Sequence, residues 1–255
     1  MPEILTNPRE YAFSARLNQL TAPLVVKSAL IRPGWDGSSL TRELLLQKKK
    51  SSLETPPDAL AIMQESVLDL SRSGILGRSV KRGELAPDFS LLNSRGTSVH
   101  LTDLLTRGPV VLSFYRGNWC PFCSIELQAL QNALPRITEL GATLVAVSPQ
   151  TIPCSEGAGG DWAPGYEVLT DNGNKVARSY GIVFHLQDEM QAIYKEFGLE
   201  LPEYNGDDSF DLPVPATYVI GVDGVVNLAF VDPDYTRRLD PAEILTSLRR
   251  LRVAA

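Results

Sequence analysis

The chain has 255 residues, of which 44% are hydrophobic and 21% charged, a balance that excludes a disordered or collagen-like protein. Its net charge of −6 and isoelectric point near 5.1 argue against sequence-independent binding to nucleic acid or anionic membranes, because both depend on a positive field. The three cysteines are odd in number and too few for a disulfide framework, so we expect a reducing compartment, the cytoplasm.

The start of the chain indicates neither export nor membrane insertion. Residues 1–6, Met-Pro-Glu-Ile-Leu-Thr, lack a basic start followed by an apolar run. The longest apolar stretches fall far short of the roughly 20 residues that span a bilayer. We therefore expect a protein with no membrane partner.

Residues 1–80 are predicted to form a helical N-terminal extension. Pro57 to Gly74 is typical of an amphipathic helix that begins at proline and ends at glycine. Its apolar side chains recur at helical spacing: Leu60, Met63, Val67 and Leu70. We expect this helix to pack on the main domain or on a second subunit. The basic and polar run 47–52 predicts a solvated connection that interrupts the helical part.

Residues 81–255 are predicted to form one α/β domain. Two hairpins are indicated by strands at 86–92 and 98–101 and at 216–220 and 224–230, each pair flanking a turn that contains glycine. Continuous apolar runs at 109–115 and 142–148 predict buried strands on either side of a helix. This order makes the two strands parallel.

Helices are predicted at four places in this domain. The first follows the strand at 109–115 and stops at Gly141, with Pro135 as the expected kink. The others lie at 174–180, 187–197 and 241–251, the last with Asp240 as its N-cap.

Two of the three cysteines, Cys120 and Cys123, stand at the junction of the central strand and its helix. If Pro121 is the first helical residue, Cys120 is the N-cap and Cys123 lies in the first turn. Free backbone N–H groups and the positive helix end then stabilise a thiolate and lower its pKa. This spacing also lets the two sulfurs form a disulfide.

Two other interpretations of the pair stay open. A C-x-x-C motif can be half a zinc site or simply packed inside the protein, which would make the chain a non-catalytic binding module. Zinc requires further ligands, and Cys154, His100 and His185 form no close pair in the sequence. We therefore favour redox chemistry, with no metal and no cofactor.

The segment Trp119-Cys120-Pro121-Phe122-Cys123 after a hydrophobic strand resembles the active-site turn of the thioredoxin fold. Val214-Pro215-Ala216-Thr217 is similar to the cis-proline segment that faces this turn. The longer frame, about 83–251, resembles the peroxiredoxin-like branch of the alkyl hydroperoxide reductase/thiol-specific antioxidant superfamily. It matches that branch at 86–89, 114–117, 123–127, 147–150 and 216–220. The resemblance implies a thioredoxin-like central mixed sheet flanked by helices.

Two positions depart from the family pattern. In typical peroxiredoxins, a loop with the pattern Pro-x-x-x-Thr/Ser-x-x-Cys binds peroxide. When this pattern is aligned with the chain, Arg116 stands at the proline, Cys120 at the hydroxyl residue and Cys123 at the attacking cysteine. The arginine expected just before the later strand is absent from 211–215, and Arg116 is a substitute positive charge. By similarity to thioredoxins, Cys120 is instead the attacking sulfur and Cys123 the resolving one. Both assignments of the attacking sulfur stay open.

The resemblance implies an oxidoreductase that reduces hydrogen peroxide or organic hydroperoxides through a Cys120–Cys123 dithiol/disulfide cycle. Its reductant would be thioredoxin, glutaredoxin or glutathione, and a homodimer is an alternative to a monomer. A thiol–disulfide oxidoreductase acting on a protein or small disulfide is the competing function. Trp119 is expected either to shield the disulfide or simply to pack as an aromatic side chain. Arg116 is expected either to lower the thiolate pKa or hold peroxide, or to form an ordinary surface ion pair. A cis Pro215 is expected to face the sulfurs. Cys154 is expected to be an incidental loop cysteine.

Overall fold

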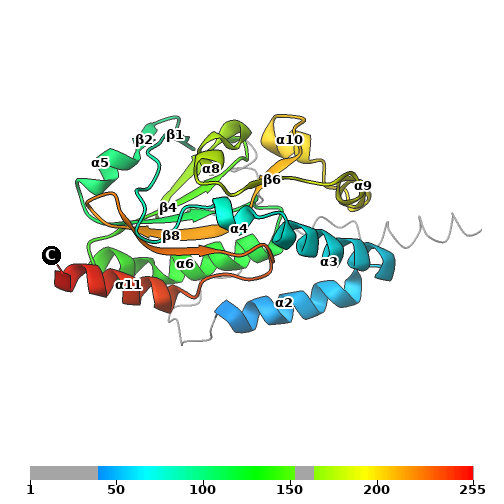
Figure 1. Ribbon diagram of the computed structural model, residues 1–255, viewed down its shortest axis with the longest axis horizontal. Coiled ribbons are helices and arrows are strands. Elements are labelled where there is room, and N and C mark those ends of the chain that lie inside the picture. Colours follow the sequence, from blue (N-terminus) through cyan, green and yellow to red (C-terminus); the bar gives the residue numbers. More distant parts are fainter. Residues whose placement is uncertain (1–39, 153–163, 255) are drawn as a thin grey trace, which may run out of the picture.

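The computed structural model describes residues 40–152 and 164–254 (Figure 1). Cys154 lies outside these residues. The N-terminal part contains α2 (Leu40–Glu54), α3 (Pro57–Arg72) and α4 (Ile75–Arg78). There follow β1 (Ser90–Asn93), β2 (Ser98–His100), α5 (Leu101–Leu105), β3 (Val110–Phe114), α6 (Pro121–Glu139), β4 (Thr143–Ser148) and β5 (Glu167–Thr170). The last elements are η1 (Asn172–Asn174), α8 (Lys175–Ser179), β6 (Val183–His185), α9 (Asp188–Glu196), α10 (Leu201–Asn205), β7 (Asp211–Pro213), β8 (Ala216–Ile220), β9 (Val226–Val231) and α11 (Pro241–Ala254).

A seven-stranded mixed sheet in the order β2-β1-β5-β4-β3-β8-β9 forms the centre of the domain. Strand β3 pairs parallel with β4, with Val110 opposite Thr143, and antiparallel with β8, with Val110 opposite Ile220. The expected strand–helix–strand unit and both expected hairpins, β1–β2 and β8–β9, are confirmed. Strands β6 and β7 form a separate antiparallel pair. The thioredoxin-like mixed sheet flanked by helices is therefore confirmed.

The central strand β3 supplies side chains to both faces of the sheet because successive residues of a strand point in opposite directions. Val111 belongs to the apolar cluster that contains α6 and α11. Leu112 and Phe114 belong to a second cluster on the opposite face, which includes α5. Figure 1 shows α6 and α11 below the sheet and α5 and α8 above it. The strand is thus covered on both sides, and its C-terminal end lies between the two layers.

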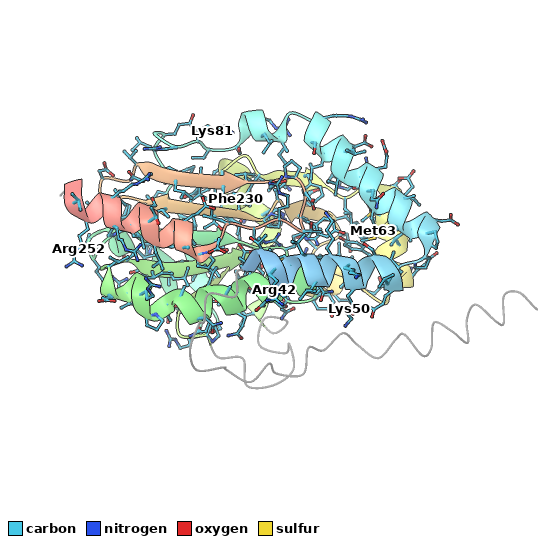
Figure 2. All side chains as sticks on the ribbon, turned by 90° about the horizontal axis from the view of Figure 1, so that it is seen from below. Arg42, Lys50, Met63, Lys81, Phe230 and Arg252 are labelled. Carbon is cyan, nitrogen blue, oxygen red and sulfur yellow. The ribbon has the colours of Figure 1, made fainter. Side chains whose placement is uncertain are left out.

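Helix α2 packs against α6 and extends the lower helical layer, as the view from below shows (Figure 2). Leu40 and Leu44 are buried in the same cluster as α6. The run 47–52 lies inside α2, so the expected solvated connection is wrong. Lysine and glutamine are good helix formers, and the three lysines, 48–50, stay exposed to water while the helix continues.

Helix α3 confirms the amphipathic helix expected from the spacing of its apolar residues, and it packs on the main domain. Ala59 joins a third apolar cluster with Leu186, Met190 and Ile193, which places α3 against α9. A boundary between an extension and a domain at residue 80 stays a prediction.

The four helices expected in the α/β domain are present as α6, α8, α9 and α11, whereas α5 and α10 were not predicted. Helix α6 continues through Pro135 to Glu139, and Asp240 accepts a hydrogen bond from the backbone N–H of Ala242 at 2.9 Å, as expected of an N-cap. Among residues 40–152 and 164–254, none of the helices combines the length and apolar character needed for a bilayer span.

Candidate active site

Cys120 and Cys123 stand at the start of α6, where the chain arrives from β3 through a short loop. Cys120 is the N-cap with extended backbone (φ −91°, ψ 114°), Pro121 is the first helical residue and Cys123 lies in the first turn. Proline suits this position for two reasons. A backbone N–H at the first helical residue has no partner within the helix, so nothing is lost when proline lacks it, and the fixed φ of proline fits the helix. The expected arrangement at the helix start is confirmed.

Both cysteines are free thiols with no exposed surface. Their sulfurs lie close enough to interact, and the interaction with Cys123 helps to lower the pKa of Cys120. The pair lies in a buried place at the positive end of a 19-residue helix. Two thiols in this relation can join as a disulfide without a large movement of the backbone.

Arg116 lies beside Cys120 and is only 4% exposed. Its Nη2 donates to Sγ of Cys120 at 3.1 Å and its Nη1 to the hydroxyl of Tyr194 at 2.9 Å. The guanidinium also stacks over the Tyr235 ring at 4.1 Å from the centroid and over Trp119 at 5.2 Å. Within the described part of the chain no carboxylate pairs with it, so the buried counter-charge within its reach is a Cys120 thiolate.

A second arginine, Arg238, lies beside Cys123 and was not among the expected site residues. Its Nη2 donates to Sγ of Cys123 at 3.3 Å. Its Nε donates to the carboxylate of Glu126, which also accepts from Thr217 at 3.4 Å. Glu126 and Arg238 are both buried. The charge of this arginine is therefore already balanced, unlike that of Arg116.

These contacts move the pKa values of the two thiols in opposite directions. Burial alone raises the pKa of Cys120, but the hydrogen bond from Cys123 and the charges of Arg116 and Arg238 outweigh it and hold that pKa well below its usual value. Burial and the adjacent Cys120 sulfur raise the pKa of Cys123 well above its usual value. These shifts favour the thiolate at Cys120 and the protonated thiol at Cys123.

The loop before α6 is held by packing and by a buried amide. Gly117 has φ +157°, and a Cβ there would lie 2.2 Å from Nε1 of Trp119, so only glycine lets the indole fold over the loop. Gln150 is fully buried and accepts from the backbone N–H of Asn118 at 2.8 Å while donating to its side-chain oxygen at 2.6 Å. Half-buried Trp119 packs edge-on against Tyr194. These contacts with Gln150 and Tyr194 hold the loop in place before the helix.

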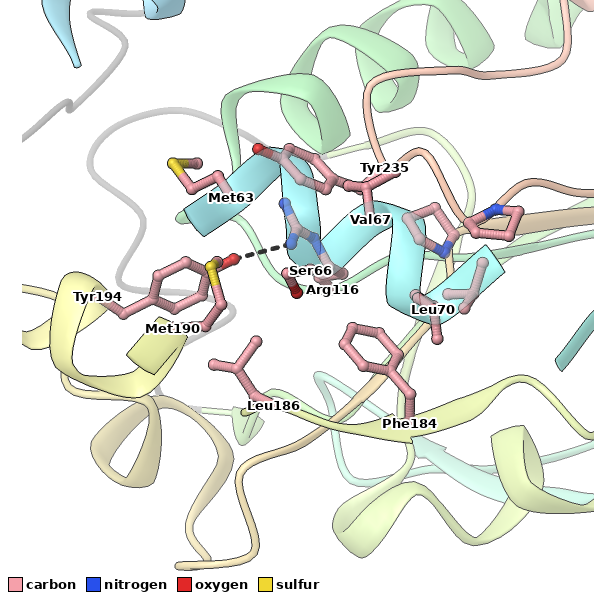
Figure 3. A pocket seen from close by; sticks show the side chains of 13 residues that line it. Met63, Ser66, Val67, Leu70, Arg116, Phe184, Leu186, Met190, Tyr194 and Tyr235 are labelled. Atoms are coloured by element: carbon pink, nitrogen blue, oxygen red, sulfur yellow. Dashed lines mark hydrogen bonds between the residues drawn. The ribbon is translucent and has the colours of Figure 1, made fainter. Parts of the chain in front are cut away.

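A cavity borders Arg116 on the side of α3 (Figure 3). Pro215 contributes to its wall, but the described residues contain no cis peptide bond, so the expected cis proline is wrong. The chain passes from β7 to β8 over two residues, and Val214 N–H bonds to the carbonyl of Ile182 at 2.8 Å, a path that needs no reversal at the proline.

The two histidines lie elsewhere. His185 interacts with Asp211 at 3.0 Å, His100 with Ser98 at 3.3 Å, and both are exposed. No group of three or more histidine, cysteine or acidic side chains suited to a metal ion occurs in residues 40–152 and 164–254.

The sequence predicts that Cys120, Cys123, Arg116 and Trp119 belong to one site. The structure places all four in contact with one another or with shared neighbours. Arg238 was missed as a partner. Its only sequence signal is the pair Arg237-Arg238, in which one arginine is exposed and bonds Asp232 while the other is buried. No local pattern distinguishes the two.

Residues 82–229 match the model of the AhpC/TSA family. The chain is 25% identical over 222 residues to the chloroplastic peroxiredoxin Q of Gentiana triflora, covering 87% of each chain. It is similar in structure to peroxidoxin BcpB from Mycobacterium tuberculosis, with TM-score 0.53 and 24% identity over 68% of this chain and 99% of that one.

A third relative is a yeast mitochondrial 1-Cys peroxiredoxin, described with a thiol resolving mechanism via glutathione/thioredoxin systems. Its TM-score is 0.53 and its identity 18%, covering 68% of this chain and 77% of that one.

Proposed function

Since this chain belongs to the AhpC/TSA family and is a peroxiredoxin-like oxidoreductase, we propose that it is a thiol-dependent peroxidase working through a Cys120–Cys123 dithiol/disulfide cycle. The observation that carries the proposal is the hydrogen bond from buried Arg116 to Cys120, next to a second thiol. A buried cation without a carboxylate partner stabilises a thiolate, and the thiolate is the form of cysteine that attacks peroxide.

The cycle has three balanced steps. The Cys120 thiolate attacks one peroxide oxygen and the O–O bond breaks, which gives a sulfenic acid on Cys120 and an alcohol or water after uptake of a proton. The Cys123 thiol then attacks the sulfenic sulfur and water leaves, which forms the disulfide. Two equivalents of an external thiol reduce the disulfide and are themselves oxidised.

The attacking and resolving roles follow from the charges around each sulfur. Cys120 faces an arginine whose charge has no other anion among the described residues, whereas Arg238 beside Cys123 is already paired with Glu126. The proposal therefore follows the thioredoxin-like assignment, with Cys120 attacking and Cys123 resolving. When Cys123 loses its proton during resolution, Arg238 stabilises the charge that forms.

The reductant and the compartment belong to the same proposal. Glutathione, glutaredoxin or thioredoxin would supply the electrons, and the glutathione/thioredoxin systems named for the yeast relative support a donor of this class. The cytoplasm stays a prediction, and the plant relative is named as chloroplastic. A homodimer also stays a prediction.

Reduction of a disulfide substrate is the second candidate. The C-x-x-C pair at the helix start favours it, because the same low-pKa thiolate also attacks disulfides. The complete burial of both sulfurs favours small disulfides over protein disulfides, which need an accessible sulfur.

The test measures peroxide consumption with dithiothreitol as the electron donor. We expect turnover by the parent protein and by Cys154→Ser, which serves as the matched control, and loss of turnover in Cys120→Ser. In Cys123→Ser the sulfenic acid on Cys120 has no internal thiol to condense with, so we expect no intramolecular disulfide and reduction of the sulfenic acid by dithiothreitol itself. Absence of protein-dependent peroxide loss, together with reduction of a small disulfide such as oxidised glutathione, would overturn the peroxidase in favour of the second candidate.

A further inference from the structure

Glu126 is a buried carboxylate that takes no direct part in the proposed cycle. It lies one helical turn after Cys123 on α6, so the two side chains are on the same face of the helix. Its carboxylate accepts hydrogen bonds from Nε of Arg238 and, at 3.4 Å, from the hydroxyl of Thr217 on β8. Burial raises the pKa of Glu126, and the charge and hydrogen bond of Arg238 oppose that rise. The carboxylate and this arginine therefore stabilise each other in the interior.

Arg238 connects this carboxylate to the sulfurs. Its Nε donates to Glu126, while its Nη2 donates to Sγ of Cys123 at 3.3 Å. Its Nη1 donates to the backbone carbonyl oxygens of Tyr235 and Arg237, the second at 2.8 Å. The guanidinium is thus fixed between one anion and one sulfur. The positive charge that acts on Cys123 therefore depends on whether the anion is present.

Two arginines and one glutamate surround the two sulfurs. Arg116 donates to Cys120 at 3.1 Å and, within the described part of the chain, has no carboxylate partner. Burial raises the pKa of Tyr115, which also faces Cys123, to about 12, so this phenol stays neutral. One negative charge on the sulfur pair therefore balances the site, because a single thiolate and Glu126 together match the two arginines.

We propose that Glu126 determines which sulfur is the thiolate: by neutralising Arg238 it keeps Cys123 protonated and leaves the negative charge on Cys120. The inference rests on the proposed peroxidase function where it assigns the attack on peroxide to Cys120. Glu126 is a positioning residue, since it acts on the sulfurs through the guanidinium that it holds. Without the carboxylate charge, Cys123 would lie beside an unbalanced arginine, as Cys120 does.

The test removes the charge of Glu126 and keeps the shape of its side chain. In Glu126→Gln the amide oxygen still accepts a hydrogen bond, and we expect Cys123 to ionise near neutral pH because its thiolate then balances Arg238. Reduced protein is treated with a limiting amount of iodoacetamide, and fragmentation of the peptide that contains both cysteines locates the label. The ratio of label on Cys123 to label on Cys120 should rise at least about tenfold over the parent, the change in thiolate that one pKa unit produces.

The matched control is Glu139→Gln, the same exchange at an exposed residue at the other end of α6, and it should leave the ratio unchanged. The double variant Glu126→Gln/Arg238→Gln removes both charges of the pair and should return the label to Cys120. A ratio in Glu126→Gln equal to that of the parent overturns the inference. A label that stays on Cys123 in the double variant also overturns it, because the effect would then not come from the charge of Arg238.

A second variant, Arg116→Gln, leaves the Glu126–Arg238 pair intact and decides the question if Glu126→Gln does not fold. We expect slow labelling of both sulfurs near neutral pH, since neither then lies beside an unbalanced charge. Preferential labelling of Cys123 in this variant would mean that Glu126 leaves the charge of Arg238 available, which overturns the inference. None of these measurements uses peroxide. Absence of peroxide turnover in the parent therefore overturns the proposed function, while the labelling ratios test the role of Glu126 separately.

Discussion

At the scale of single residues, the sulfurs of Cys120 and Cys123 each accept a hydrogen bond from an arginine, Arg116 and Arg238 respectively. The two arginines differ in their other partners. Arg238 bonds the Glu126 carboxylate, whereas Arg116 bonds a tyrosine hydroxyl and two aromatic rings. Rings and hydroxyls stabilise a buried cation much less than an anion does. The Cys120 thiolate is therefore part of the electrostatic balance of the folded protein.

Replacing Arg116 by glutamine should raise the pKa of Cys120. The charge of Arg116 helps to hold that pKa below its usual value, so its removal shifts the pKa toward or above the usual value of about 8.5. Iodoacetamide alkylation of Cys120, followed by peptide mass spectrometry, should start at higher pH than in the parent. The peroxidase rate near neutral pH should fall about 10²-fold.

Arg237→Gln is the matched control, because the Arg237 side chain is exposed and pairs with Asp232. Its alkylation profile should coincide with that of the parent. An unchanged profile in Arg116→Gln would contradict the assignment of the thiolate to Cys120.

The two single serine variants should differ in stability. Cys120→Ser leaves Arg116 buried without an anion, and removal of one partner of a buried charge pair costs about 3–5 kcal/mol. Cys123→Ser leaves Arg238 paired with Glu126 and should cost about 1 kcal/mol. Urea unfolding of the reduced proteins near pH 8 measures both free energies. Equal losses would show that Arg116 does not depend on the sulfur.

Much of this residue-scale picture was predictable. Pro121 between the two cysteines locates the helix start, and Arg116 is close enough in the sequence to be a candidate. Arg238 was not predictable as a partner of Cys123, because its contact bridges 115 positions of sequence. Only the fold brings such a pair together.

At the scale of elements, α2 is an integral part of the helical layer below the sheet. Its two buried leucines contact the cluster of α6, and Lys48 bonds Asp234 at 3.0 Å near the loop that carries Arg238. The helix thus packs beside the site from the lower layer.

Leu44→Ala should therefore destabilise the protein by about 2–4 kcal/mol, the cost of a cavity in a packed core. The matched control is Leu45→Ala, one residue further along α2, where the leucine is 62% exposed. It should change the free energy of unfolding by less than about 0.5 kcal/mol. Chemical denaturation measures both, and a small loss in Leu44→Ala would mean that α2 does not contribute to the folded core.

The sequence predicts α3 from the helical spacing of its apolar residues, and it predicts β3 and β4 from their continuous apolar runs. The polar part of α2 was not predictable, because the run 47–52 has no apolar residue to reveal its helical period. Strand β5 was also missed. It is a four-residue strand, and no long apolar run separates it from its surroundings.

At the scale of the whole molecule, the site joins parts that are far apart in the chain. The loop after β3 supplies Arg116, α9 supplies Tyr194, and the segment between β9 and α11 supplies Tyr235 and Arg238. Opening any one of these contacts exposes a buried charge, so we expect the site to be formed cooperatively with the fold.

The stability of the reduced protein should depend on pH through Cys120. Its folded pKa lies below the unfolded value, so the thiolate contributes stability that is complete above about pH 8.5 and is lost as pH falls through the folded pKa. The free energy of unfolding of the parent should rise with pH up to that value. In Cys120→Ser this rise should be smaller, as measured by urea titrations at several pH values. The same slope in both proteins would contradict a depressed pKa.

The most direct test of the central claim is a single-turnover oxidation of reduced Cys154→Ser protein with one equivalent of peroxide, followed by intact-mass and peptide mass spectrometry. The proposed cycle predicts one peroxide consumed per chain, a mass lower by two hydrogen atoms, and one disulfide between Cys120 and Cys123. A chain that keeps both thiols while peroxide persists, or that gains a stable oxygen on one sulfur without forming this disulfide, would contradict it.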